Sequence, residues 1–97
     1  MEYKNNYESV LILKGTYTED EYKKALNEII EKIKKLIEIE KVDEIGLKKL
    51  AYEVQNNKTG YYVVIYYKAI SQAVLEMERL YRINEDIIKF LTVRKEG

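Results

Sequence analysis

Residues 61–67 form an uninterrupted run of seven apolar or aromatic side chains, Tyr-Tyr-Val-Val-Ile-Tyr-Tyr. The run is too short for a typical helix, and it is rich in the β-branched and aromatic residues that favour strands. Turn-forming residues, 56–60, stand before it, and a second strand-like segment ends at Val54. Because five residues that include a glycine are a common hairpin length, we predict two antiparallel neighbouring strands, the later one being a central strand.

The segment before the hairpin predicts a strand followed by a long helix. Residues 7–13 are dense in apolar and β-branched types, which places a strand at about Tyr3–Lys14, ended by Gly15. Thr18 and Glu21 form a capping-box pair, so a helix is expected to begin there. Its apolar face repeats at steps of three and four residues and comprises Tyr22, Leu26, Ile29, Ile30, Ile33, Leu36 and Ile37.

A long strand, a second helix and a final strand complete the pattern. Apolar residues stand among charges over Ile39–Val54, which suits a long strand, and Gly46 inside this strand predicts a bulge. Helical spacing returns over about Ser71–Tyr81, and Asn84 is expected to end that helix in the left-handed conformation that Asn tolerates. The apolar residues of 83–93 then predict the fourth strand.

Two β-α-β halves joined by a hairpin define the order β-α-β-β-α-β. This order predicts an α+β protein of the ferredoxin-like plan, a four-stranded antiparallel sheet with two helices on one face. The 97 residues fit a single domain that spans residues 1–97. With both helices on one face, the other face of the sheet is expected to meet water or a partner.

The composition excludes much of enzyme chemistry. The chain has no Cys and no His, which removes thiol nucleophiles, thiolate zinc sites and imidazole bases. The loop after the first predicted strand, residues 14–17, carries neither an Arg nor a glycine-rich phosphate cradle. Glu85 and Asp86 are metal-ligand types, but a solvated turn explains them better because no His or third carboxylate stands nearby. We therefore predict a binding protein that is not an enzyme, with no catalytic residues, no metal, no cofactor and no small-molecule substrate.

The chain shows no sequence signal for secretion or membrane insertion. No basic region followed by an apolar run and a small-residue cleavage site stands near its beginning. No apolar stretch approaches the ~20 residues that a membrane helix needs. We expect a cytoplasmic location and no membrane partner.

The hairpin combines a basic pair, Lys48 and Lys49, with several tyrosines. Ammonium groups displace counterions at phosphates and flat rings stack on unpaired bases, so this combination suits RNA. Residues 60–63 nevertheless depart from the pattern of the RNA-recognition motif, which argues against that kind of base stacking on the sheet. The alternative is that strand alternation places rings in the core and lysines on a solvated edge. Net charge does not decide, because 17 basic residues balance 17 acidic residues.

A second basic group lies near the end of the chain and comprises Arg79, Arg82, Lys89, Arg94 and Lys95. Arg79 and Arg82 are three residues apart and so are neighbours on one face of the second predicted helix. Compensation of the helix dipole and protection of an edge strand by Lys explain this group as well as a binding function does.

Longer segments of the sequence resemble a known family. Residues 46–54, Gly-Leu-Lys-Lys-Leu-Ala-Tyr-Glu-Val, and residues 60–63, Gly-Tyr-Tyr-Val, resemble the hairpin of the sixth protein of the bacterial small ribosomal subunit. Tyr7 with Glu8, the Leu-Tyr-Arg-Ile-Asn-Glu passage at 80–85 and residues 88–94 are similar to the corresponding parts of that family. The resemblance therefore covers essentially the full chain.

The resemblance implies a structural, non-enzymatic protein of the ferredoxin-like fold. Family members bind small-subunit ribosomal RNA as a heterodimer with the eighteenth small-subunit protein, which implies these partners and a ribosomal location here. Carried over position by position, the resemblance implies an RNA-facing surface with Tyr7, Lys48, Lys49, Lys89 and Arg94. It also implies a protein-partner surface near Leu50, Tyr52, Tyr62 and Val64. Many members have Arg at the three Lys positions, so bidentate phosphate contacts become point-charge contacts.

A second hypothesis needs no RNA. The tyrosine-rich residues 61–67 on an uncovered sheet face, or an edge strand, would also suit a ferredoxin-like interaction module that self-associates. Co-purification with ribosomal subunits supports the first hypothesis, whereas a stable homodimer without RNA supports the second.

Overall fold

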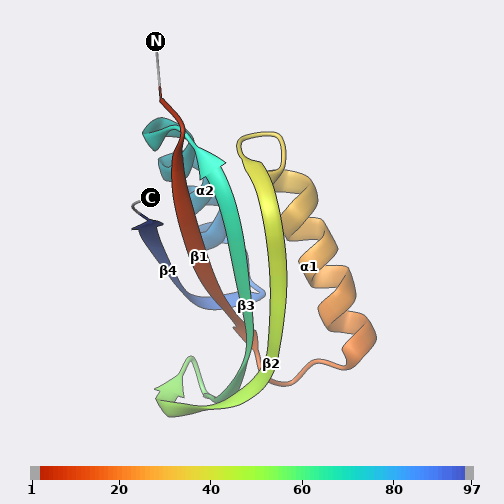
Figure 1. Ribbon diagram of the computed structural model, residues 1–97. Coiled ribbons are helices and arrows are strands. Elements are labelled where there is room, and N and C mark those ends of the chain that lie inside the picture. Colours follow the sequence, from red (N-terminus) through yellow and green to blue (C-terminus); the bar gives the residue numbers. More distant parts are fainter. Residues whose placement is uncertain (1–2, 96–97) are drawn as a thin grey trace.

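The computed structural model describes residues 3–95 and shows a four-stranded antiparallel sheet with two helices (Figure 1). The elements follow the chain in the order β1 Asn5–Lys14, α1 Glu19–Ile33, β2 Glu38–Val54, β3 Asn57–Ala69, α2 Ser71–Ile83 and β4 Ile87–Lys95. The sheet order is β2-β3-β1-β4, so β3 is central as predicted, and β2 and β4 are the edges. Figure 1 shows α2 behind the sheet and α1 beside β2, and residues of both helices pack in one core with β1 and β3, which confirms the predicted ferredoxin-like plan. None of the helices within residues 3–95 is long and apolar enough to span a bilayer.

Strand alternation divides the side chains of the sheet between a helix-covered face and an open face. The helix-covered face buries Leu11 and Leu13 of β1 and Val63 and Ile65 of β3, all with no exposed surface. The two helices cover these strands with side chains that include Ile29, Ile33 and Met77. Burial of each large aliphatic side chain contributes about 1.5–3 kcal/mol, so this layer is the main source of stability.

Helix α1 begins as predicted but ends earlier. The Thr18 hydroxyl accepts a hydrogen bond from the Glu21 N–H at 3.3 Å, and the Glu21 carboxylate accepts one from the Thr18 N–H at 2.9 Å. These hydrogen bonds lower the pKa of Glu21. The helix ends at Ile33 because the chain then turns, with the Leu36 N–H bonded to the Ile33 carbonyl. Leu36 is therefore exposed, whereas Ile37 reaches the core.

The hairpin turn is shorter than the sequence pattern predicts. β2 ends at Val54 and β3 begins at Asn57, so the turn has two residues and the predicted five-residue loop is wrong. Gln55 and Asn56 have φ angles of 48° and 65°, the left-handed backbone of a type I′ turn, whose twist matches that of paired strands. The Asn57 side-chain amide donates hydrogen bonds to the carbonyls of Val54 and Gln55 at 3.2 and 3.0 Å, which stabilises this tight reversal. The turn-forming residues 57–60 therefore begin β3.

The two backbone predictions at Gly46 and Asn84 have different outcomes. The register of β2 against β3 shifts between Glu44 and Gly46, and Gly46 has a φ of 104°, so the predicted bulge is confirmed. Asn84 is extended, with φ −84° and ψ 116°, so its predicted left-handed conformation is wrong. Its side-chain oxygen instead accepts a hydrogen bond from the Asp86 N–H at 2.8 Å, which forms the local turn into β4.

A small polar cluster lies inside the apolar core. Ser9 is fully buried, and its hydroxyl lies 2.9 Å from the Tyr67 hydroxyl and 3.3 Å from the Thr92 hydroxyl. Burial raises the pKa of Tyr67 and of Tyr81, so both hydroxyls stay protonated and able to donate. Tyr81 is 1% exposed, yet its hydroxyl has no hydrogen-bond partner within residues 3–95. An unpaired buried hydroxyl costs stability.

Removal of the two tyrosine hydroxyls should therefore have different effects on the free energy of unfolding. Tyr67→Phe deletes a buried hydrogen bond with Ser9 and should lower that free energy by about 1 kcal/mol. Tyr81→Phe removes an unpaired group and should leave the free energy unchanged or raise it by up to about 1 kcal/mol. Urea unfolding of both variants measures the difference, and a loss from Tyr81→Phe as large as that from Tyr67→Phe would contradict the unpaired state of the Tyr81 hydroxyl.

Candidate nucleic-acid and partner interface

The open face of the sheet is mixed in character and changes along the strands. Alternate residues of β1 point to this face, and their register with β3 and β4 is regular over the middle of the sheet. The register forms three rows, Tyr66–Glu8–Val93, Val64–Val10–Leu91 and Tyr62–Ile12–Lys89. Leu91 is 60% exposed and Val93 is 39% exposed, so apolar surface lies on the β4 side of this face.

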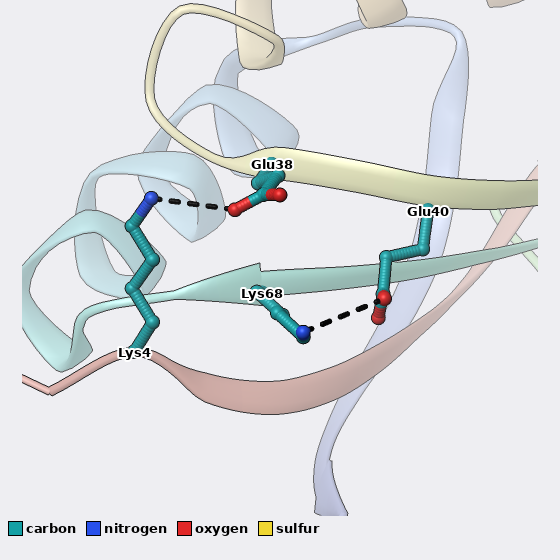
Figure 2. A network of polar contacts seen from close by, with 4 residues as sticks. All are labelled: Lys4, Glu38, Glu40 and Lys68. Atoms are coloured by element: carbon teal, nitrogen blue, oxygen red, sulfur yellow. Dashed lines mark hydrogen bonds and ion pairs between the residues drawn. The ribbon is translucent and has the colours of Figure 1, made fainter.

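At one end of the open face, the charged side chains neutralise one another. The Lys4 ammonium lies 3.3 Å from the Glu38 carboxylate, and Lys68 lies 3.9 Å from Glu40 on the neighbouring strand (Figure 2). Nearby on the edge, Lys95 pairs with Glu8 at 2.7 Å, and this contact raises the pKa of Lys95. Cations that already have an acidic partner gain less from a phosphate, so these three lysines are poor contacts for a polyanion.

At the other end, the hairpin folds back over the open face. Leu50 packs against Ile12 of β1 and Ile88 of β4 in a second apolar cluster, with Tyr62 at its margin. Gly60 permits this contact, because a Cβ at that position would overlap Ile12 Cγ2 and lie 3.3 Å from Leu50 Cδ2. Figure 1 shows the β2–β3 hairpin bending towards the start of β4. The cluster fixes the position of the side chains on the hairpin relative to β4.

Lysines at this end contact tyrosine rings instead of carboxylates. The Lys48 ammonium lies 5.9 Å from the centre of the Tyr62 ring, and the Lys89 ammonium lies 5.5 Å from the centre of the Tyr52 ring. Lys89 also donates a hydrogen bond to the Tyr52 hydroxyl at 3.4 Å. Neither lysine makes an ion pair within residues 3–95. A cation–π contact of about 0.5–1 kcal/mol orients an ammonium group without neutralising it, so both remain able to bind an anion.

The structure therefore brings together five of the residues that the sequence singled out, Lys48, Leu50, Tyr52, Tyr62 and Lys89. Lys49 is exposed on the same hairpin and lines a hollow of about 200 Å³ with Lys58. Lys58 was missed by the sequence analysis because it was assigned to the turn. With a two-residue turn, Lys49 pairs with Thr59, and this register places Lys58 near Lys49.

Tyr7 and Arg94 lie at the far end of the sheet from this group. They are register partners on the helix-covered face, five residues along β4 from Lys89, or about 17 Å. Tyr7 is 9% exposed and stacks on Tyr67 with ring centres 5.7 Å apart, so the expected surface position of its ring is wrong. Arg94 is exposed and donates a hydrogen bond to the Asn5 side chain at 3.0 Å.

Two of the residues expected at a protein-partner surface are also buried. Leu50 is 9% exposed because it packs against Ile12 and Ile88, and Val64 is 8% exposed on the central strand β3. Tyr52 is 67% exposed, and Tyr62 is partly exposed beside it. Leu50 and Val64 therefore support the open face from beneath, and the tyrosines form its surface.

These features define a class, a small ferredoxin-like α+β protein that displays unpaired cations and aromatic rings on an uncovered sheet face. A sequence profile described as Ribosomal protein S6 matches residues 6–94. A small ribosomal subunit protein bS6 from a Sulfurovum species is 44% identical over 91 residues, which cover 93% of this chain and 72% of that protein. Another, from Helicobacter hepaticus, is 47% identical over 94 residues, covering 94% of this chain and 67% of that protein.

Solved structures agree with the sequence comparison. The crystal structure of 30S ribosomal protein S6 from Thermotoga maritima has a TM-score of 0.83 and 33% identity, and covers 96% of this chain and 89% of that chain. An uncharacterized protein from the same organism, with a TM-score of 0.63 and 13% identity, is similar in fold alone. The chain therefore belongs to the ribosomal protein S6 family of the small ribosomal subunit, and the predicted membership and ribosomal location are confirmed.

Leu50 should hold the hairpin against the open face. We expect Leu50→Ala to lower the free energy of unfolding by about 2 kcal/mol or more and to increase amide exchange over residues 48–60, because a cavity opens between Ile12 and Ile88. The matched control is Leu47→Ala, since Leu47 lies on the same strand but is 57% exposed and should change stability by less than about 0.5 kcal/mol. Equal losses in the two variants would show that the second cluster does not hold the hairpin.

Proposed function

We propose that this chain is a structural, non-catalytic constituent of the small ribosomal subunit that binds small-subunit ribosomal RNA together with the eighteenth small-subunit protein. The observation that carries the proposal is a pair of lysines without ion pairs within residues 3–95, Lys48 and Lys89. Both contact tyrosine rings of the β2–β3 hairpin, in a chain that belongs to a ribosomal protein family. Lys49 and Lys58 line a hollow of the same hairpin together with Glu53. Arg94 contributes a separate contact at the far end of β4.

The separation of paired and unpaired charge lets a protein of zero formal net charge bind a polyanion. Phosphate contacts by Lys release counterions from RNA, and this release makes binding weaker as the salt concentration rises. Lys contacts a phosphate as a point charge and lacks the bidentate geometry of Arg. Binding by this surface is therefore electrostatic and tolerant of RNA sequence, and further contacts must supply specificity.

The exposed apolar side chains on the same face support a protein partner. Leu91 lies on β4 in the row that also contains Val10 and Val64, and Val93 lies in the next row, beside Glu8. Tyr52 and Tyr62 continue this surface towards the lysines of the hairpin. Aromatic and aliphatic anchors beside cations are suited to an interface that a protein and an RNA share. The eighteenth small-subunit protein is the proposed occupant of the apolar part.

Charge reversal tests the RNA contact. Lys48→Glu with Lys49→Glu should weaken binding to a central-domain ribosomal RNA fragment by about tenfold or more when the eighteenth protein is present. The slope of log affinity against log salt concentration should fall by about 2, because two phosphate contacts are lost. Fluorescence anisotropy over a series of salt concentrations measures both quantities.

The matched control reverses Lys23 and Lys24, an adjacent pair of exposed lysines on α1, and makes the same change in net charge. This control should bind nearly as the natural chain does. Equal weakening in both double variants would indicate a long-range charge effect and would remove the hairpin lysines from the RNA site.

Self-association remains the second candidate, since Leu91 is 60% exposed on an edge strand. Under the proposed function, the isolated chain should sediment as a monomer at micromolar concentration, and addition of the eighteenth protein should give a heterodimer. A stable homodimer that Leu91→Lys dissociates, without RNA or the second protein, would favour self-association instead.

A further inference from the structure

A cleft of about 320 Å³ lies at the outer edge of the sheet and borders the open face at Lys89. The start of β4 forms one side, the end of α2 forms another, and Gln55 of the hairpin turn closes a third. Its lining includes Tyr81, Arg82, Lys89 and Phe90. The volume is at the lower end of the range of about 300–1,000 Å³ for small-ligand sites.

The cleft has an aromatic wall with a guanidinium group fixed against it. The centre of the Arg82 guanidinium lies 5.7 Å from the centre of the Phe90 ring. On the inner side, Phe90 contacts the buried Tyr81 ring at 5.3 Å, with the two planes tilted by 56°. Arg82 makes no ion pair within residues 3–95. The result is a planar cation that is oriented by packing and is free to bind an anion or to stack on a flat ring.

The other two polar groups differ in what they offer. The Gln55 side chain has both a donor and an acceptor, and the left-handed backbone of the tight turn places this residue opposite β4. Lys89 contributes a second cation, which already belongs to the open-face cluster through Tyr52. The cleft is thus continuous with the proposed RNA surface at Lys89.

We propose that this cleft binds one unpaired nucleotide of the RNA. The base stacks on the Arg82–Phe90 wall, the Gln55 amide faces the hydrogen-bonding edge of the base, and the phosphate lies between Arg82 and Lys89. Unpaired bases are recognised by stacking on aromatic rings or guanidinium planes with hydrogen bonds to their edges. A base within a duplex is already stacked and does not enter such a cleft. The inference rests on the proposed RNA function and adds that the RNA is single-stranded at this point.

The test titrates the full isotope-labelled chain with adenosine 5′-monophosphate and, separately, with inorganic phosphate. The nucleotide should shift the NMR signals of Gln55, Arg82 and Phe90 in a saturable manner, and phosphate alone should leave the Phe90 signals unchanged. Arg82→Lys keeps the charge and removes the planar group, so it should weaken nucleotide binding by about fivefold or more. The control Arg79→Lys, one turn earlier on α2 and outside the cleft lining, should have no such effect.

Three results would overturn the proposal. The first is the absence of saturable shifts in the cleft, and the second is equal weakening by Arg82→Lys and Arg79→Lys. The third is that phosphate reproduces every shift, which would reduce the cleft to an anion site without base stacking. These results are independent of the ribosomal RNA assay. If the chain binds ribosomal RNA through Lys48 and Lys49 but does not bind the nucleotide, the proposed function stands and only the cleft proposal fails.

Discussion

The packing of Leu50 between Ile12 and Ile88 determines the shape of the functional end of this protein. A long two-stranded ribbon beyond the sheet edge would otherwise have no fixed direction, because an isolated hairpin is marginally stable in water. The contact requires close approach over the β3 backbone, which the missing side chain of Gly60 allows. The polar side chains of the hairpin thereby lie beside those at the start of β4, and both proposed sites are built around this junction.

The same arrangement explains how a neutral chain displays positive charge. Three ion pairs lie at one end of the open face, where Glu38, Glu40 and Glu8 neutralise Lys4, Lys68 and Lys95. At the hairpin end, Lys48 and Lys89 contact tyrosine rings and make no ion pair within residues 3–95. A tyrosine ring attracts an ammonium weakly and leaves its charge available, so the field is local and unbalanced even though the formal sum is zero.

The fold could be predicted from the sequence because each element has a strong local pattern. The apolar run at 61–67, the capping box at Thr18 and the bulge at Gly46 each depend on a few neighbouring residues. Predictions failed where several local signals compete. Asn57 and Gly60 are turn-forming residues, yet one locks a two-residue turn with its side chain and the other makes room for Leu50.

The site was harder to predict than the fold, because it depends on the register between strands. Tyr7 and Tyr62 are the same residue type, and both lie in apolar strand segments. In the structure, however, Tyr7 stacks inside the core and Tyr62 contacts Lys48 on the open face. The pairing of Lys89 with Tyr52 joins residues 37 positions apart, and it requires both the bend of the hairpin and the correct turn length. Local sequence patterns do not predict a contact between residues so far apart in the chain.

The division of the open face also bears on why RNA and protein binding would be coupled. In the proposed function, Lys48 and Lys49 would supply point charges only, so an RNA contact through them would be salt-sensitive and weak in sequence discrimination. Leu91 and Val93 form an exposed apolar strip on β4. Lys89 lies two residues from Leu91 on the same strand face, so a partner on the strip would border the phosphates held by the lysines. Each ligand would then complete the binding surface of the other, and the joint complex would be more stable than either pair alone.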